Sequence, residues 1–266
     1  MAKVLLVGAG HMGQALLRSW IKFNIKGVSV IDPKVGVNNN KIFNLKLYRS
    51  SKEIKNIKNF DIIFFAVKPQ IINKVIKDYK MIPFKNKLII SIVAGKEINF
   101  FEKHFGKKTS IIRTMPNLPA SVAGGVTCLF SNKNVTLKQK NFTNNLFKAV
   151  GKTFWVKNES YINKFTAISG SGPAYFYFFI ESLSKAGVKI GLNKKESYEI
   201  AKQTAIGSIS LMKSSKDSAE KLRKKIAIKG GTTEAAIKSF QKNKNMEKSV
   251  YSGVKAAFKR AIKLGS

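Results

Sequence analysis

The sequence predicts an α/β protein in which a parallel-sheet domain precedes an all-helical domain. Through about residue 160, short apolar runs alternate with amphipathic stretches, which is the pattern of strands joined by crossover helices. From Tyr161 onward, strand-like runs become scarce and apolar residues recur at helical spacing. We therefore predict two domains, residues 1–160 and 161–266, with the boundary between residues 157 and 163.

Apolar runs predict the strands of the first domain at Val4–Val7, Val28–Ile31, Phe60–Val67, Leu88–Val93 and Ser110–Arg113. The run Phe60–Val67 is almost wholly apolar, as expected of a strand that is covered on both faces. Helical spacing predicts helices at Gln14–Phe23, at Ile71–Tyr79 and from Leu137 to Val150. Val126–Phe130 and Thr153–Val156 are predicted as edge strands.

The second domain is predicted to consist of helices at Ala174–Ala186, Glu196–Met212, Glu234–Phe240 and Met246–Leu264. Ser171-Gly172-Pro173 predicts the start of the first helix, because Pro is tolerated in a first turn. Gly187 predicts its end. The segment Gly230-Gly231-Thr232-Thr233 interrupts the helical pattern.

Composition predicts a globular protein. The chain has 266 residues and 44% hydrophobic residues, and no apolar run approaches the roughly 18 residues of a membrane span. Cys128 is the only cysteine, so the chain can form no internal disulfide. We predict a cytoplasmic protein that does not associate with membranes.

The charge of the chain is strongly positive, with 49 basic and 14 acidic residues and a net charge of +35. Only five of the basic residues are Arg, although Arg is the residue best suited to reading bases and gripping phosphates. The lysines are spread over the whole chain, and the densest cluster, within Lys221–Lys229, is short. These features favour a general enrichment of the chain in Lys, rather than a specific nucleic-acid partner, as the origin of the charge. A polyanion-binding role remains the alternative.

A G-x-G-x-x-G motif at residues 8–13 follows the first strand and opens the first helix. Gly8 permits a tight turn, Gly10 lets the main chain approach a pyrophosphate, and Gly13 lets the helix pack close to the sheet. The N–H groups of His11 and Met12 at the helix start are expected to face the phosphates. The motif predicts a Rossmann-type dinucleotide-binding domain; a plain strand–turn–helix is the alternative.

Asp32 stands 19 residues after Gly13, at the end of the second strand, where an acidic residue binds a ribose 2′-hydroxyl. A carboxylate there favours NADH. Lys34 lies two residues further and can instead bind the 2′-phosphate of NADPH. We therefore predict NADPH or NADH as the cofactor.

The remaining reactive side chains are not assigned a role in chemistry. His11 and His104 are far apart in the sequence and lack the spacing of metal ligands, so we predict no metal site. Cys128 lies in an apolar stretch and is predicted to be a core residue rather than a nucleophile.

Four further segments carry a resemblance to a known family: Ala66-Val67-Lys68-Pro69, Arg113-Thr114-Met115-Pro116-Asn117, Ile168-Ser169-Gly170-Ser171-Gly172-Pro173-Ala174-Tyr175 and Gly230-Gly231-Thr232-Thr233-Glu234-Ala235-Ala236. In this order and with these gaps, the chain resembles the pyrroline-5-carboxylate reductases nearly end to end. The resemblance implies a Rossmann domain joined to a helical dimerisation and substrate domain. It also implies reduction of 1-pyrroline-5-carboxylate to L-proline by NAD(P)H, the last step of proline biosynthesis.

The resemblance also implies roles for individual residues. The main-chain N–H groups of Gly230, Gly231 and Thr232 would bind the substrate carboxylate, and Thr233, as the catalytic residue, would hydrogen-bond the ring nitrogen. The residues that would pass beside the cofactor are Ala66, Val67, Lys68, Pro69, Ala94, Gly95 and Asn117. The resemblance further implies a homodimer or a higher homo-oligomer.

The chain departs from the family immediately before Gly230, where the family usually has Ser-Pro and this sequence has Ile228 and Lys229. Lys229 could pair with the substrate carboxylate, or it could be one more of the many lysines. A β-hydroxyacid dehydrogenase is a rival prediction. That family places a catalytic Lys soon after its Gly-rich segment, whereas here the first Lys after Gly172 is Lys185.

Overall fold

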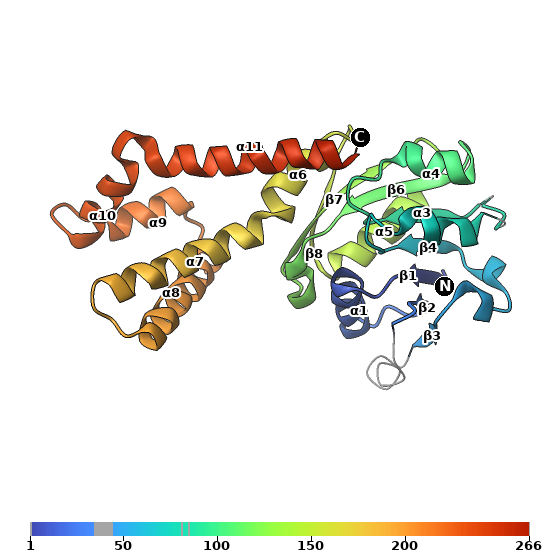
Figure 1. The fold of residues 1–266 in the computed structure, drawn as a ribbon, viewed down its shortest axis with the longest axis horizontal. Helices are drawn as coiled ribbons and strands as arrows, with labels where there is room; N and C mark the ends of the chain where they lie inside the picture. The colour runs from blue at the N-terminus through green and yellow to red at the C-terminus, as the bar shows by residue number, and fades with distance from the viewer. Residues whose placement is uncertain (1, 35–44, 81, 85, 266) are drawn as a thin grey trace. The chain divides into compact units, whose positions relative to one another are not determined.

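The structure, a computed structural model, describes residues 2–34, 45–80, 82–84 and 86–265. The chain forms two compact units, one running through Ser171 and joined by the residues from Ala257 onward, the other Gly172–Ala256. Helix α11 (Asn245–Gly265) belongs to both units (Figure 1). The predicted boundary after residue 160 falls at the start of helix α6 (Tyr161–Phe165), and as a division into domains it stays a prediction.

The first unit is built on one eight-stranded sheet, in the order β3-β2-β1-β4-β5-β6-β7-β8. The strands are β1 Val4–Val7, β2 Val28–Ile31, β3 Lys46–Tyr48, β4 Ile62–Phe65, β5 Leu88–Ser91, β6 Ser110–Met115, β7 Gly125–Ser131 and β8 Gly151–Trp155. All neighbours pair in parallel except β6 and β7. The predicted parallel-sheet fold is confirmed, but the prediction that Val126–Phe130 is an edge strand is wrong: β7 pairs on both sides, and only β8 lies at that edge.

Helices cover both faces of the sheet (Figure 1). Alternate strand residues such as Leu6 and Phe64 pack against α1 (His11–Lys22) and α5 (Leu137–Lys148). The other strand residues pack against α3 (Ile72–Val75), the 3₁₀ helix Ile76–Tyr79 and α4 (Ile98–Phe105). This burial on both faces explains why the strands are nearly continuous apolar runs.

Trp20 fastens α1 into the core. Its ring packs edge-on against Phe64, with the ring centroids 5.4 Å apart. Its indole N–H donates to the carbonyl of Leu146 on α5 at 2.8 Å, which satisfies the polar atom of this fully buried side chain. Both helices on this face are thereby held in one layer.

The second unit contains α7 (Gly172–Lys189), α8 (Lys194–Ser214), α9 (Ala219–Ile226), α10 (Thr232–Gln241) and most of α11. The four predicted helices are present. The predicted end of the first at Gly187 is wrong, because α7 continues to Lys189 and Gly187 instead makes room for Ser197 of α8. The Ser197 hydroxyl donates to the carbonyl of Ser184 across this contact at 2.6 Å.

Among the strands and α-helices of the described residues, four were not predicted from the sequence: β3, α4, α6 and α9. Strand β3 has three residues and lies at the open edge beside β2, so it lacks a long apolar run. Helix α9 is rich in Lys and has no buried residue, so its few apolar residues do not form a recognisable apolar face. Among the described helices, none is long and apolar enough to cross a membrane.

Candidate active site

The predicted cofactor residues lie together at one edge of the sheet. Because strands β1 to β6 are parallel, their carboxyl ends meet at the same edge. Gly8, Asp32, Ala66, Ala94 and Asn117 follow β1, β2, β4, β5 and β6 along the chain. The strand order reverses its direction at β1 and β4, and in such sheets ligands bind at this reversal point.

The glycines at positions 8, 10 and 13 each meet a different steric demand. Gly8 has a φ of +101°, and a Cβ there would lie 2.8 Å from the carbonyl oxygen of Ala66. A Cβ on Gly13 would lie 2.5 Å from the carbonyl oxygen of Gly8, so α1 packs directly on the turn. In the described part of the chain no atom lies within 4 Å of a Cβ on Gly10. The first and third glycines thus shape the turn, and the middle one leaves open space for a ligand.

The start of α1 is open to an anion. Its N-cap is Gly10, and among the described residues no side chain caps it and no acidic residue stands in the first turn. The N–H groups of His11 and Met12 have no partner within the helix, because the first turn of any α-helix leaves its donors unpaired. This arrangement suits a phosphate.

Asp32 forms a hydrogen bond to the glycine turn. One carboxylate oxygen accepts the main-chain N–H of Ala9 at 2.7 Å, and the other accepts the N–H of Lys34 at 2.8 Å. The sequence predicts only a ribose contact for Asp32, because Ala9 lies 23 residues away and no local pattern indicates this bond. Asp32 therefore links the end of β2 to the phosphate cradle, with Lys34 exposed beside it.

The predicted segment Ala66–Pro69 begins beside the glycine turn. The N–H of Ala66 donates to the carbonyl of Val7 at 2.8 Å, and Ala66 and Val67 are half-buried while Lys68 is exposed. The segment therefore presents both main chain and side chains at the carboxyl edge of the sheet.

A part-buried ion pair holds the start of α4, a few residues after the turn Ala94–Gly95. The guanidinium of Arg113 on β6 lies 2.9 Å from a carboxylate oxygen of Glu159, which also accepts the N–H of Ile98 at 2.9 Å. Glu97 lies 3.7 Å from the same guanidinium nitrogen. Sequence analysis did not assign Arg113 or Glu159 a role, and their separation of 46 residues left no local pattern to find them.

Asn117 uses both ends of its side-chain amide within the protein. Its oxygen accepts the N–H of Val126 and its nitrogen donates to the carbonyl of Ser169, each at 2.8 Å. The residue is only 7% exposed. Its place beside a cofactor stays a prediction from the sequence.

The predicted substrate loop lies in the second unit at the start of α10. Gly230 has a φ of +75°, and its N–H donates to Glu234 at 2.9 Å. The N–H of Gly231 donates to the carbonyl of Ile228 at 3.0 Å. Two of the three N–H groups predicted for the substrate carboxylate are thus bonded inside the loop.

The first turn of α10 remains available to an anion. Its N-cap is Gly231, and no side chain in the described part of the chain caps it. The helix begins at Thr232, so the unpaired donors are the N–H groups of Thr232 and Thr233. Thr233 stands second in the helix, inside it rather than at the cap, and is half-buried, whereas Lys229 is exposed.

Glu234 is a residue of this loop that sequence analysis missed as a site residue. Its carboxylate accepts the Gly230 N–H and pairs with Lys238 at 3.0 Å, and these contacts lower its pKa. It therefore fixes the turn before the helix. An acidic residue at the third helical position is the signal that could have found it.

The other reactive side chains considered from the sequence are buried or bonded within local structure. Burial raises the pKa of the Cys128 thiol to about 12, so this thiol stays protonated and unreactive. His104 contacts the carbonyl of Phe100 in its own helix, and Lys185 pairs with Glu181 on the surface of α7. Within the described residues, no group of His, Cys, Asp and Glu side chains could hold a metal ion.

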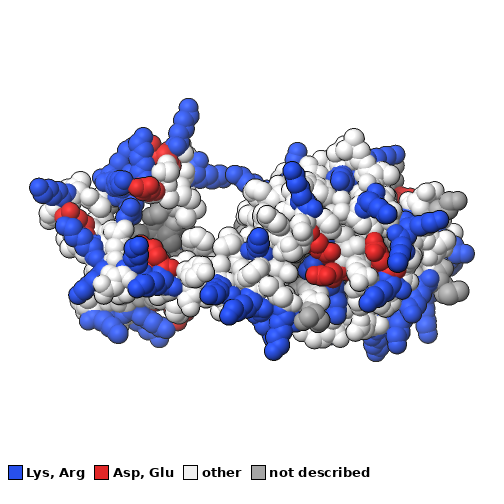
Figure 2. Space-filling view, turned by 90° about the horizontal axis from the view of Figure 1, so that it is seen from above, with Lys and Arg blue, Asp and Glu red and all other residues white. Residues whose placement is uncertain are grey.

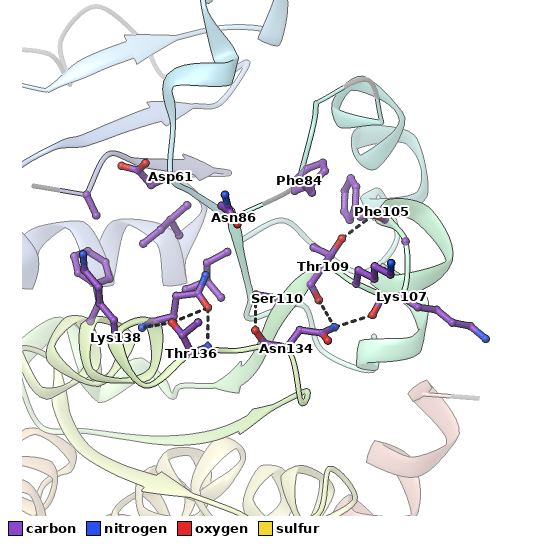
Figure 3. A pocket seen from close by; sticks show the side chains of 17 residues that line it. Asp61, Phe84, Asn86, Phe105, Lys107, Thr109, Ser110, Asn134, Thr136 and Lys138 are labelled. Atoms are coloured by element: carbon purple, nitrogen blue, oxygen red, sulfur yellow. Dashed lines mark hydrogen bonds between the residues drawn. The ribbon is translucent and has the colours of Figure 1, made fainter.

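A pocket of about 1250 Å³ lies at the opposite, amino edge of the sheet (Figure 3). Two of its polar side chains make bonds within the local structure. Asn134 donates to the carbonyls of Lys107 and Thr109, and Thr136 caps α5. These bonds hold together the loops that line the pocket.

The positive charge is dispersed. Figure 2 shows Lys and Arg side chains spread over the visible face rather than gathered in one patch. Several lysines of α9 are paired within that helix region, such as Lys224 with Glu220 and Lys221 with Asp217. This distribution supports the prediction that the positive charge comes from a general enrichment in Lys rather than from a specific binding site.

Two family models match the chain. One, described as pyrroline-5-carboxylate reductase dimerisation, matches residues 159–264, and the other, described as NADP oxidoreductase coenzyme F420-dependent, matches residues 3–95. The pyrroline-5-carboxylate reductase of Haemophilus influenzae is 32% identical, covering 89% of this chain and 88% of the relative. That of Pseudomonas aeruginosa is 32% identical over 98% of this chain and 96% of the relative.

Solved structures show the same likeness. The chain resembles Plasmodium falciparum pyrroline carboxylate reductase with NADP bound, with a TM-score of 0.85, 34% identity, and coverage of 100% and 98% of the two chains. It resembles the Coxiella burnetii pyrroline-5-carboxylate reductase with a TM-score of 0.90, 30% identity, and coverage of 100% and 99%.

Proposed function

The chain belongs to the pyrroline-5-carboxylate reductase family, and we propose that it reduces 1-pyrroline-5-carboxylate to L-proline with NADPH or NADH, the last step of proline biosynthesis. One observation supports this most directly. Each compact unit carries a helix that starts after a glycine N-cap with no side-chain cap among the described residues, α1 in one unit and α10 in the other. The reaction needs two anion sites of this kind, one for a pyrophosphate and one for a carboxylate.

The first unit fits a dinucleotide. A reduced nicotinamide dinucleotide, when bound, supplies the hydride for a C=N bond. The start of α1 would receive the pyrophosphate over Gly10, where the main chain is open. Asp32 would face the ribose next to the adenine, and Ala66–Pro69 and Ala94–Gly95 would line the path toward the nicotinamide.

The second unit fits the substrate. The N–H groups of Thr232 and Thr233 would receive the carboxylate of the cyclic imine at the positive end of α10. Exposed Lys229 would add a positive charge beside it. The Thr233 hydroxyl would hydrogen-bond the ring nitrogen and set which face of the ring accepts the hydride.

The chemistry needs no strong acid in the protein. The imine nitrogen carries a proton before the reaction. The new C–H bond forms at the ring carbon of the C=N bond, whose π electrons pass to nitrogen and leave a neutral ring amine, which is then protonated by solvent. Positioning can therefore supply most of the rate, which agrees with a site made of Gly, Thr and main chain.

The cradle and the loop belong to different units, so the reaction requires two units, of one chain or of two, to meet. We propose a homodimer or a larger homo-oligomer formed by the second unit, in agreement with its match to a dimerisation model. Large apolar side chains are exposed on its helices, among them Phe176, Tyr177, Phe178, Ile200, Ile206 and Tyr251. Such a surface is typical of an oligomer interface. A cytoplasmic location stays a prediction from the sequence.

The direct test is oxidation of NADPH and NADH by the purified protein with 1-pyrroline-5-carboxylate, together with identification of L-proline as the product. We expect both cofactors to be consumed in a substrate-dependent way and one proline to form per cofactor oxidised. Cofactor binding without turnover would contradict the proposed function and would favour a regulator that keeps the fold.

A further inference from the structure

The first unit contains a π-helical turn just before Gly172, where the second unit begins. Thr166–Gly170 follows α6 and leads into α7, and the Thr166 carbonyl accepts the N–H of Ser171, five residues later, at 2.9 Å. Single π turns inside helices are uncommon and are found frequently at functional sites. This one ends where the second unit begins.

Pro173 gives a local cause for the break in the α-helical pattern. An α-helix would pair the carbonyl of Ser169 with the main-chain N–H of residue 173. Proline has no N–H group, so this carbonyl loses its helical donor. The side chain of Asn117 donates to it instead, at 2.8 Å. Asn117 thus supplies the hydrogen bond that Pro173 cannot make.

Asn117 is itself held firmly by the sheet unit. Its amide oxygen accepts the N–H of Val126 at the start of β7, and its carbonyl accepts the N–H of Ala120 at 3.1 Å. Rotating the amide by half a turn would place its NH₂ group against the Val126 N–H, so the orientation is determined. The bond to Ser169 therefore fixes the π turn relative to the ends of β6 and β7.

We propose that Asn117 and Pro173 together set the π turn from which α7 starts, which makes Asn117 a positioning residue for hydride transfer. This inference rests on the proposed function, in which the first unit holds the cofactor and the unit that begins with α7 holds the substrate. A π turn contains one residue more than an α turn. Its relaxation would rotate the following helix by about 100° and shift it by about 1.5 Å.

A displacement of that size matters for the reaction. A misplacement of about 1 Å between reacting groups can lower a rate by about 100-fold. We expect the cofactor cradle at the start of α1 to stay intact when the turn relaxes. Loss of the Asn117 donor should therefore reduce turnover without weakening cofactor binding.

The test compares Asn117→Ala with Asn132→Ala. Asn132 is a matched control, because its side-chain amide also bridges β6 and β7, but at the other end of β6. Its oxygen accepts the N–H of Ile111 at 3.2 Å, and its nitrogen donates to the carbonyl of Thr109 at 2.8 Å. We expect both variants to lower Tm. Only Asn117→Ala should lower kcat, by about 10- to 100-fold, with the Kd for NADPH from fluorescence titration close to that of the wild type.

Pro173→Ala is the second variant, and it avoids loss of a buried hydrogen bond. An N–H at residue 173 would offer Ser169 its helical donor and compete with Asn117, so kcat should fall although the protein folds. Equal losses of kcat in Asn117→Ala and Asn132→Ala would overturn the proposal. So would a raised Kd for NADPH in Asn117→Ala with unchanged kcat, which would make Asn117 a cofactor contact.

A wild-type protein that binds NADPH but does not turn over would overturn the proposed function instead. Amide hydrogen exchange over residues 167–172 then still tests whether Asn117 stabilises the π turn. Faster exchange there in Asn117→Ala but not in Asn132→Ala supports it, and unchanged exchange in both variants overturns it.

Discussion

The main-chain carbonyl of Leu264 occupies the space that a side chain on Gly95 would need. Gly95 follows β5 at the carboxyl edge of the sheet, and Leu264 stands in the last turn of α11. The end of the chain's last helix thus closes over a turn that is proposed to face the cofactor. Gly95 also has a φ of +73°, a conformation that favours glycine.

Gly95→Ala is expected to weaken cofactor binding, because the new methyl group must displace either α11 or the turn itself. Gly106→Ala is the control. Gly106 has a similar φ of +92°, but no described atom lies within 4 Å of the added methyl group. Backbone strain alone should cost Gly106→Ala about 1–3 kcal/mol, because its ψ of 148° places it in a region that only glycine adopts readily. Thermal unfolding and titration with NADPH will compare them, and equal Kd values for the two variants would show that the contact with Leu264 is unimportant.

Asp32→Ala is expected to shift cofactor preference toward NADPH, because it removes a carboxylate that would repel a 2′-phosphate. Since Asp32 also accepts the N–H of Ala9, affinity for both cofactors should fall somewhat. Asp61→Ala is a matched control, because Asp61 accepts the N–H of Lys3 at 2.8 Å at the other edge of the sheet. Values of kcat/KM for NADH and NADPH in all three proteins provide the test. An unchanged ratio in Asp32→Ala would remove Asp32 from the account of specificity.

Glu234 should make stability and substrate binding depend on pH. Its folded-state pKa is lowered from the ordinary 4.5 by the Gly230 N–H and by Lys238. Its contribution is therefore present above about pH 4.5 and is lost as the pH falls through the lowered pKa. Glu234→Gln should remove this dependence and raise KM for the imine, because the turn before α10 loosens.

The control for Glu234 is Glu220→Gln. Glu220 is exposed, and its pKa is likewise lowered, in this case by Lys224 in α9. Its loss should change the pH profile of stability in the same direction but leave KM unchanged. If both variants keep the wild-type KM, Glu234 does not shape the substrate loop.

The sequence was most informative where structure is local. The glycine turn and the buried strands could be predicted because each depends on residues that are close together in the sequence. The link from Asn117 to Ser169 spans 52 residues and the ion pair of Arg113 with Glu159 spans 46, so no local pattern reveals them. Gly187 misled the prediction of a helix end because its role is to let α8 approach α7, which is a tertiary effect.

The second unit is expected to bring chains together at working concentration. Its helices expose Phe176, Phe178 and Tyr251 to more than 60%. Burying such side chains against a partner would stabilise an oligomer by about 25 cal/mol per Å² of apolar surface. Light scattering should report at least a dimer. Phe178→Glu should raise the dissociation constant and lower activity per chain at low concentration, and an active wild-type monomer would contradict the prediction.

Thr233→Ala is expected to lose activity while the protein keeps its stability and its cofactor affinity. Thr233 is the second residue of α10 and Gly231 is the N-cap, so its side chain does not cap the helix. A lost hydrogen bond to the ring nitrogen should cost about 1–3 kcal/mol, or roughly five- to two-hundred-fold in kcat/KM. Thr233→Ser keeps the hydroxyl and should restore most of that activity.

Thr136→Ala provides the contrast, because Thr136 is a true N-cap whose hydroxyl accepts the N–H of Gln139 at 3.2 Å. That variant should lower Tm, with about 0.5–2 kcal/mol of stability lost, and leave kcat/KM intact. If Thr233→Ala retains full activity with 1-pyrroline-5-carboxylate, the substrate does not bind on this loop in the way proposed.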